Sequence, residues 1–343
     1  MISVILPVFN EEDSIPAVAD EVGVQLARLG TSFELIFVDD GSTDGSLRVL
    51  AELSRLDSRI KAVRLSRNFG HQVAISAGLE YASGDAVIVM DADLQHPPEL
   101  IPELVAHWKD GYDVVYTIRT GQAHANVFKR LTAALFYRLL NRICDINISI
   151  DANTPDFRLL DRRVVNVLRR LPERARFVRG LVRWVGFRQK AVHFTARRRT
   201  RGSTKYPLSR MLRFSMDGVT AFSTMPLRFA SYLGGLAATA AIPYAMWAIY
   251  KRLFTDDAVH GWASVVVAVL ILGGVQLICL GIIGEYLGRV YEESKGRPLF
   301  ITDKVIGDFG PAMADAEPRS TTSWDDSATP VAVGTPLRRT TSQ

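Results

Sequence analysis

The sequence predicts an α/β protein, in which a mostly parallel sheet is covered by helices on both faces and is followed by a two-helix membrane hairpin. Two observations support this class. The first hundred-odd residues alternate apolar, β-branched runs with amphipathic stretches, a pattern typical of a parallel sheet buried on both faces. Further along the chain, two segments of 22 residues carry no charged side chain.

Five apolar runs predict the strands of the sheet. They are Ile2–Phe9, Phe33–Val38, Ile60–Leu65, Ala86–Met90 and Asp113–Ile118. Between the first two runs, apolar residues from Ile15 to Leu26 recur at helical spacing. Ligands of such sheets bind beyond the carboxyl ends of the strands, so the residues that follow each run are candidates for a site.

Acidic clusters follow three of the predicted strands, at residues 7–12, 39–45 and 91–96. In extended chain, Asp91 and Asp93 point to the same side, and such a carboxylate pair suits a hard divalent cation. A short acidic motif can also be a helix cap. Three clusters at one sheet edge favour a binding site. No G-x-G-x-x-G follows the first strand, which argues against a dinucleotide-dependent oxidoreductase.

The basic charge is concentrated in one block. Residues 119–213 hold 23 Lys and Arg against 5 Asp and Glu, whereas residues 1–118 hold 8 against 19. So basic a block predicts a phosphate-bearing partner, which can be nucleic acid, anionic lipid or a phosphorylated substrate. The two cysteines, Cys144 and Cys279, are far apart, which argues against a disulfide framework and a cysteine metal site.

Phe229–Tyr250 and Ala263–Gly284 are the charge-free segments, and each is long enough to cross a hydrocarbon core of about 30 Å. A pair of buried core helices is the alternative. Basic residues flank the pair on its outer sides, so the positive-inside rule predicts a multi-pass plasma-membrane protein with its catalytic domain and both termini in the cytoplasm. Because the basic block adjoins these spans, we expect it to meet membrane lipids, with no nucleic acid as partner.

Apolar residues from Leu208 to Val219 recur at helical spacing, which predicts an interfacial amphipathic helix, with a core-facing helix as the alternative. The predicted organisation is a catalytic domain at 1–206, this helix at 207–227, two spans within 228–290, a cytoplasmic segment at 291–310 and a disordered tail at 311–343. Paired spans are also compatible with a homo-oligomer.

Six motifs carry a family resemblance. They are Pro-Val-Phe-Asn-Glu-Glu at 7–12, Val-Asp-Asp-Gly-Ser-Thr-Asp at 38–44, Asn-Phe-Gly-His-Gln at 68–72, Asp-Ala-Asp-Leu-Gln-His-Pro-Pro-Glu at 91–99, Asp-Phe-Arg-Leu-Leu-Asp-Arg-Arg at 156–163 and Gly-Ser-Thr-Lys-Tyr at 202–206. With the two C-terminal spans, residues 1–300 resemble the inverting family 2 glycosyltransferases, and among them the polyprenyl-phosphate glycosyltransferases. The resemblance implies a Rossmann-like GT-A fold and transfer of a sugar from a nucleotide sugar to a polyprenyl phosphate.

The resemblance also implies roles for individual residues. The donor nucleotide would be bound by Pro7, Asn10, Glu11, Asp39, Asp40, Asp91 and Ala92, and Mg²⁺ or Mn²⁺ by Asp91, Asp93 and Gln95. The catalytic residues would be Asp91, Asp93, Asp156 and Arg158. The acceptor phosphate would meet Arg119, Arg130, Arg158, Arg201 and Lys205, for each of which a solvated surface cation is the alternative. His71 and His96 are expected to be turn residues, with a contact to the diphosphate or the sugar as the alternative.

A phosphate acceptor removes the need for a general base. The second pKa of a phosphate monoester is about 6, so the nucleophile is already largely ionised at neutral pH. Asp156 is therefore expected to orient Arg158 or the metal shell. The family branch with paired C-terminal spans and Phe222-Ser223-Thr224 near the first span implies UDP-glucose or a related UDP-sugar as the donor, and undecaprenyl phosphate as the acceptor.

Three alternatives stay open. A mannosyltransferase using GDP-mannose would differ only in its donor. A processive polysaccharide synthase usually carries Gln-x-x-Arg-Trp, whereas the segment from Gly180 to Trp184 here lacks the glutamine. The third alternative is a catalytically silent scaffold that only binds nucleotide.

Overall fold

The computed structural model describes residues 1–120, 154–174, 176–195, 225–254 and 262–309. Its strands are β1 (Ile2–Val8), β2 (Phe33–Asp39), β3 (Ile60–Leu65), β4 (Ala86–Val89), β5 (Val114–Thr120), β6 (Arg158–Asp161), β7 (Gln189–Thr195) and β8 (Thr302–Ile306). Its helices are α1 (Ile15–Arg28), α2 (Ser46–Leu56), α3 (His71–Tyr81), η1 (Pro98–Leu100), α4 (Ile101–Lys109), α6 (Arg162–Arg170), α7 (Val178–Trp184), α9 (Met225–Phe254) and α10 (Trp262–Ser294).

The strands form one mixed sheet in the order β7-β5-β6-β4-β1-β2-β3-β8. Strands β4, β1, β2 and β3 run parallel, β5 and β7 also pair in parallel, and β6 and β8 are antiparallel to their neighbours. The predicted mostly parallel α/β fold is therefore confirmed. The five predicted strands are present: Ile60–Leu65 matches β3 at both ends, and the ends of the other four differ by at most two residues. Arg119 therefore lies within β5 rather than after it.

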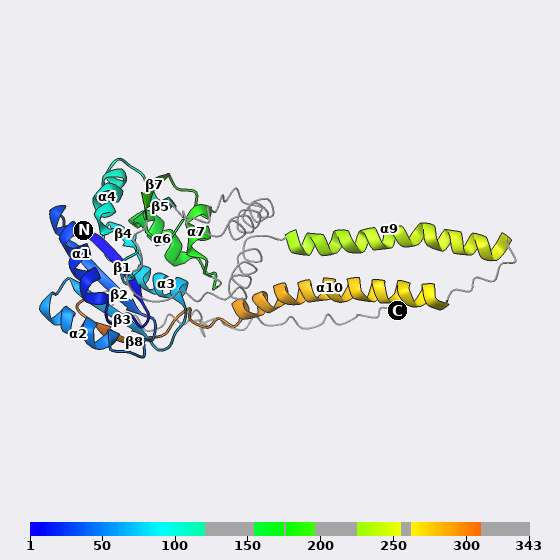
Figure 1. The fold of residues 1–343 in the computed structure, drawn as a ribbon, viewed down its shortest axis with the longest axis horizontal. Coiled ribbons are helices and arrows are strands. Elements are labelled where there is room, and N and C mark those ends of the chain that lie inside the picture. Colours follow the sequence, from blue (N-terminus) through cyan, green and yellow to red (C-terminus); the bar gives the residue numbers. More distant parts are fainter. Residues whose placement is uncertain (121–153, 175, 196–224, 255–261, 310–343) are drawn as a thin grey trace, which may run out of the picture.

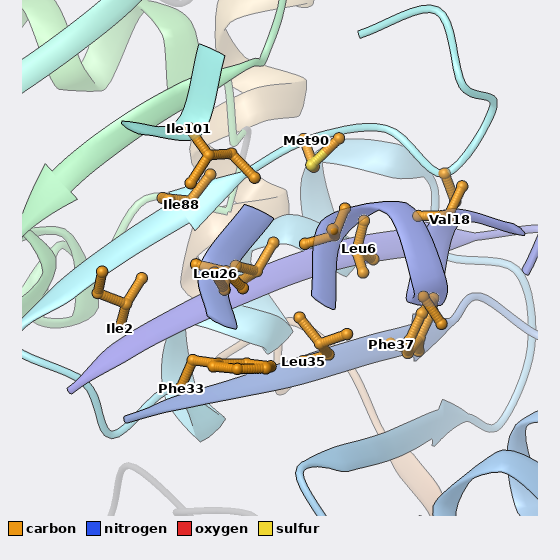
Figure 2. Close-up of a cluster of buried hydrophobic side chains, with 14 of the residues drawn as sticks. Ile2, Leu6, Val18, Leu26, Phe33, Leu35, Phe37, Ile88, Met90 and Ile101 are labelled. Carbon is orange, nitrogen blue, oxygen red and sulfur yellow. The ribbon is translucent and has the colours of Figure 1, made fainter. Parts of the chain in front are cut away.

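Alternate residues of each buried strand face opposite layers of helices. On one face, Ile2, Leu6, Leu35 and Phe37 pack against α1 and α4, as Figure 2 shows around Leu26 and Ile101. On the other face, residues such as Ile5 and Val89 pack against α3, α6 and α7. The sheet is buried on both sides, which explains why its central strands are continuously apolar.

The strand β8 lies within the segment 291–310, which the sequence predicted only as cytoplasmic chain. It pairs antiparallel with β3, and the hydroxyl of Thr302 lies 3.1 Å from that of Tyr81. Because β8 follows α10, the chain leaves the helical hairpin and returns to the edge of the sheet (Figure 1).

Two arginines of α6, Arg162 and Arg169, bind backbone carbonyl groups near the end of α3. Arg169 donates to the carbonyl oxygens of Leu79, Glu80 and Ala82 at 2.6–2.8 Å, and Arg162 donates to those of Ala82 and Gly84. These carbonyls belong to the last turn of α3 and the chain beyond it, which have no partners within the helix. The two arginines therefore cap the carboxyl end of α3.

Helices α9 and α10 lie side by side and project away from the sheet (Figure 1), with the Cys279 sulfur 3.5 Å from the Ala230 carbonyl oxygen. Among the described helices, α10 alone passes a length-and-hydropathy test for a membrane span, over Ile271–Ser294 with mean hydropathy 1.6. The predicted spans fall on α9 and α10. Residues 207–224 of the predicted interfacial helix and the whole predicted tail, 311–343, lie outside the described residues.

Candidate functional site

The carboxyl ends of β1, β2 and β4 lie next to one another because the three strands are parallel neighbours. The predicted acidic clusters therefore meet at one edge of the sheet. Asn10, which follows β1, has a positive φ of 56°, and its side-chain oxygen accepts from the Thr43 N–H at 2.8 Å. Its own N–H donates to the Ser42 hydroxyl at 2.9 Å, so the loops after β1 and β2 are joined.

Asp39 and Asp40 are both buried, at the end of β2. Asp39 accepts from the Ser42 N–H at 2.8 Å, and Asp40 accepts from the N–H groups of Phe69 and Gly70 at 2.7 and 2.8 Å. Burial raises the pKa of Asp40 above its ordinary value, although these backbone hydrogen bonds partly oppose the shift. Asp40 therefore links the end of β2 to the turn that begins α3.

The other residues that were predicted to bind the donor nucleotide differ in how exposed their side chains are. Glu11 accepts from the Ser14 hydroxyl at 2.9 Å. Pro7 and Ala92 are buried, so they contribute backbone shape rather than an exposed side chain.

Asp91 lies between two histidines. Its Oδ1 is 3.3 Å from Nε2 of His71, and its Oδ2 is 3.7 Å from Nε2 of His96. The Asp91 N–H donates to Nδ1 of His96 at 3.1 Å, and the buried His96 ring stacks on Phe157. The sequence predicted that both histidines only form turns. In the structure both also lie beside the Asp91 carboxylate. The available signal was that His71 and His96 lie within two of the family motifs, at 68–72 and 91–96.

Asp93 and Gln95 form the turn after Asp91, in which Leu94 has a φ of 59°. Asp93 Oδ1 accepts from the Gln95 N–H at 3.1 Å, and Gln95 Oε1 accepts from Arg119 Nη2 at 2.9 Å.

The residues fit a bound Mg²⁺ or Mn²⁺. Asp91 and Asp93 offer carboxylate oxygens, and the buried Oδ1 of Asp91 has no hydrogen bond within the described residues. No group of three or more His, Cys, Asp or Glu that could hold a metal occurs among the described residues. A cation here would therefore complete its shell with substrate phosphates and water, as Mg²⁺ usually does.

Asp156 is the most heavily hydrogen-bonded carboxylate near the site. It is 2% exposed and accepts from Gln72 at 3.0 Å, from two nitrogens of Arg179 at 2.9 Å each, and from Arg158 at 3.3 Å. Burial alone would raise the pKa of Asp156, but the contacts with His71 and the two arginines outweigh it and hold the pKa well below its ordinary value. No sequence motif pointed to Arg179.

Arg158 differs from its predicted role as a phosphate-binding cation. It is 2% exposed, and its Nη2 donates to the carbonyl of Pro155 and to Asp156. Burial lowers the pKa of Arg158 to about 10, although the charge of Asp156 opposes the shift. Its guanidinium faces the interior, which fits a role in fixing Asp156. Arg119 is partly exposed, and Arg130, Arg201 and Lys205 lie outside the described residues.

His71 completes the link between the two parts of the site, because its Nε2 is also 3.3 Å from Asp156 Oδ2. Burial alone would lower the pKa of His71, but the contact with Asp156 and the charge of Asp91 raise it above its ordinary value.

Comparison with known proteins defines the class of enzyme as a glycosyltransferase. Residues 3–169 match glycosyl transferase family 2, and residues 225–290 match the GtrB C-terminal hairpin. The chain is 49% identical over 305 residues to the uncharacterized glycosyltransferase YkcC of Bacillus subtilis (strain 168), covering 89% of this chain and 94% of that protein. The chain belongs to glycosyltransferase family 2.

Two further proteins are similar. The bactoprenol glucosyl transferase of Shigella phage SfV is 40% identical over 300 residues, covering 88% of this chain and 97% of that protein. Among solved structures, glucosyl-3-phosphoglycerate synthase from Mycobacterium tuberculosis is 22% identical, with a TM-score of 0.45, and covers 64% of this chain and 76% of that chain.

Proposed function

We propose that the enzyme transfers glucose from UDP-glucose to undecaprenyl phosphate at the cytoplasmic face of the plasma membrane, with inversion at the sugar. The observation that carries this proposal is the near full-length similarity to bactoprenol glucosyl transferases, at 40% identity over 88% of the chain for the phage SfV protein. The match of residues 225–290 to the GtrB hairpin extends the similarity beyond the catalytic domain.

The donor side of the proposed site uses the loops after β1 and β2. Buried carboxylates such as Asp39 and Asp40 can accept hydrogen bonds from base and ribose groups, and Asn10 and Glu11 lie on the adjacent loop. Asp91 and Asp93 would hold Mg²⁺ or Mn²⁺. When bound, that cation supplies positive charge that stabilises the departing nucleoside diphosphate.

The state of Asp156 supports a reaction without a general base. Its two oxygens already accept from three side chains, and its lowered pKa leaves it ionised and a poor proton acceptor at neutral pH. An acceptor phosphate needs no deprotonation in this pH range, because its second pKa is about 6. Asp156 is then a structural anchor for Arg158 and Arg179.

The acceptor side is proposed to combine basic residues with the hairpin. Arg119 is held beside the acidic turn by Gln95, where it can face a phosphate. Arg130, Arg201 and Lys205 are proposed as further phosphate contacts. The helices α9 and α10 would anchor the enzyme in membrane lipids, with both termini cytoplasmic, and could support a homo-oligomer.

The test is incubation of the purified full-length protein and Mn²⁺ or Mg²⁺ with undecaprenyl phosphate and a panel of UDP- and GDP-sugars, with the glycolipid detected by mass. We expect a glucosyl product from UDP-glucose, none with undecaprenol, which lacks the phosphate, and a large loss of kcat in Asp93→Asn. A mannosyl product from GDP-mannose would identify the mannosyltransferase alternative. Polymer formed without lipid phosphate would identify a synthase, and no turnover with any donor would support the scaffold.

A further inference from the structure

His71 is a histidine to which the proposed reaction assigns no task. It is the first residue of α3, and its Nε2 lies 3.3 Å from Asp91 Oδ1 and 3.3 Å from Asp156 Oδ2. One ring nitrogen therefore faces two carboxylates that come from distant parts of the chain. Two ionised carboxylates so near to each other repel, and the positive end of the Nε2–H dipole beside both of them reduces that repulsion.

The two carboxylates are held very differently. Asp156 is fixed in the interior by hydrogen bonds from Gln72, Arg158 and Arg179. The Asp91 side chain is 33% exposed, and its Oδ1 has no hydrogen bond within the described residues. His71 thus meets a rigid acceptor on one side and, on the other, a carboxylate whose orientation depends on few contacts.

The backbone around His71 is also held in place. The N–H groups of Phe69 and Gly70 donate to Asp40, and the side-chain oxygen of Gln72 accepts from the N–H of Val178 at 2.9 Å. The chain segment that carries the ring is therefore fixed to β2 on one side and to α7 on the other. A side chain that aims a metal ligand has to be supported in this way, because a loosely held one would not limit the rotation of the carboxylate.

We infer that His71 is a positioning residue: its Nε2–H, steadied by Asp156, orients the Asp91 carboxylate toward the divalent cation and the donor diphosphate. The inference rests on the proposed function, in which Asp91 and Asp93 hold the cation. The role requires an N–H at the position of Nε2 and no change in protonation during the reaction.

Three substitutions test this role in the full-length protein. His71→Ala removes the Nε2–H group. His71→Gln places an amide N–H close to the position of Nε2, whereas the shorter His71→Asn does not reach it. His107→Ala is the matched control, because His107 lies on α4 beside Glu103 and Asp110 and away from the site.

The readouts are Mn²⁺ affinity in the presence of UDP, followed by electron paramagnetic resonance, and separate kcat and KM values for the sugar donor. We expect His71→Ala and His71→Asn to weaken Mn²⁺ binding by about 10- to 100-fold and to lower kcat more than they raise KM. His71→Gln should recover most of both losses, and His107→Ala should match the unmodified enzyme. Thermal unfolding checks that each variant is folded. If His71→Ala does not fold, His71→Asn is the variant that decides the test.

Unchanged Mn²⁺ affinity in His71→Asn, or no recovery in His71→Gln, would overturn the inference, as would an unmodified enzyme that binds no Mn²⁺. Failure of the proposed function is a separate result. An unmodified enzyme that binds Mn²⁺ and UDP but glucosylates no polyprenyl phosphate would contradict the proposed acceptor, while the Mn²⁺ affinities of the variants would still decide the role of His71.

Discussion

Gly41 directly follows the two carboxylates at the end of β2. Its φ is 72°, a conformation that residues with a side chain disfavour. A Cβ at this position would lie 2.6 Å from the backbone carbon of Arg67, so the loop can pass the neighbouring chain only if the residue is glycine. Gly30 also has a positive φ, of 62°, but nothing lies within 4 Å of its Cβ position. Substitution of Gly30 therefore tests backbone strain alone, whereas substitution of Gly41 tests backbone strain together with a steric clash.

We expect Gly41→Ala to lower the thermal unfolding midpoint more than Gly30→Ala, and to weaken UDP binding, because displacement of the loop moves Asp40. Gly30→Ala should cost only the strain of the left-handed conformation, about 1–2 kcal/mol. Calorimetry measures both the unfolding and the UDP affinity. Equal effects of the two substitutions on UDP affinity would contradict this prediction.

Glu34 in β2 gives a prediction about pH. It is 2% exposed and accepts from Lys61, Ser3 and Ser83. Burial alone would raise the pKa of Glu34, but these hydrogen bonds outweigh it and lower the pKa below the value of the unfolded chain. Because the folded pKa is the lower one, the stabilisation is present above about pH 4.5 and is lost as the pH falls through the folded pKa.

Glu34→Gln should therefore lower the unfolding midpoint clearly at about pH 7 and much less at about pH 3.5. Thermal unfolding of both proteins across this range measures the difference. The same loss at both pH values would show that the ionised form of Glu34 does not supply the stabilisation.

At the scale of elements, the end of α3 depends on another helix. The guanidinium of Arg169 donates to three carbonyls at or just beyond the last turn of α3, where the helix dipole also favours positive charge. The neighbouring Arg170 is exposed. At the carboxyl end of α6, Arg169 thus contacts α3, whereas the exposed Arg170 offers a comparison.

Arg169→Leu should lower the free energy of unfolding by about 2 kcal/mol or more, because hydrogen bonds from a charged group are lost and carbonyls are left without partners. Arg170→Leu, the matched control, should change it by less than about 0.5 kcal/mol. Denaturant unfolding measures both. A similar loss in the two variants would argue against the capping role.

The elements also show what the sequence could and could not predict. The central strands were predictable because burial on both faces makes them continuously apolar. The role of α6 could not be predicted, because its four arginines are typical of a solvated helix face in sequence, whereas two of them bind carbonyls brought near by folding. The acidic strand ends could be predicted to meet, but Arg179 could not, since only the tertiary fold brings α7 to Asp156.

At the scale of the molecule, the hairpin carries large apolar side chains to the surface of both helices. Leu277 is 71% exposed near the middle of α10, and Leu287 is 64% exposed nearer its carboxyl end. In the proposed membrane arrangement, Leu277 faces hydrocarbon and Leu287 lies toward the cytoplasmic surface.

Leu277→Arg should reduce the fraction of protein that resists alkaline extraction from membranes, because an arginine at the centre of a span costs about 2.5–3.5 kcal/mol. Leu287→Arg should have a smaller effect, since its side chain can reach the lipid head groups. Equal extraction of the two variants and the unmodified protein would contradict the membrane position of α10.

The length of α10 has a consequence for how the enzyme meets its acceptor. Its 33 residues extend for about 50 Å, whereas a hydrocarbon core measures about 30 Å. The excess, nearest the sheet, bears Glu293, which accepts from the Arg174 N–H at 2.7 Å, and the chain then enters β8 (Figure 1). In the proposed arrangement, the part of α10 outside the bilayer holds the transfer site at a fixed distance from the membrane surface. The lipid phosphate would then have to leave the plane of the head groups to reach the sugar.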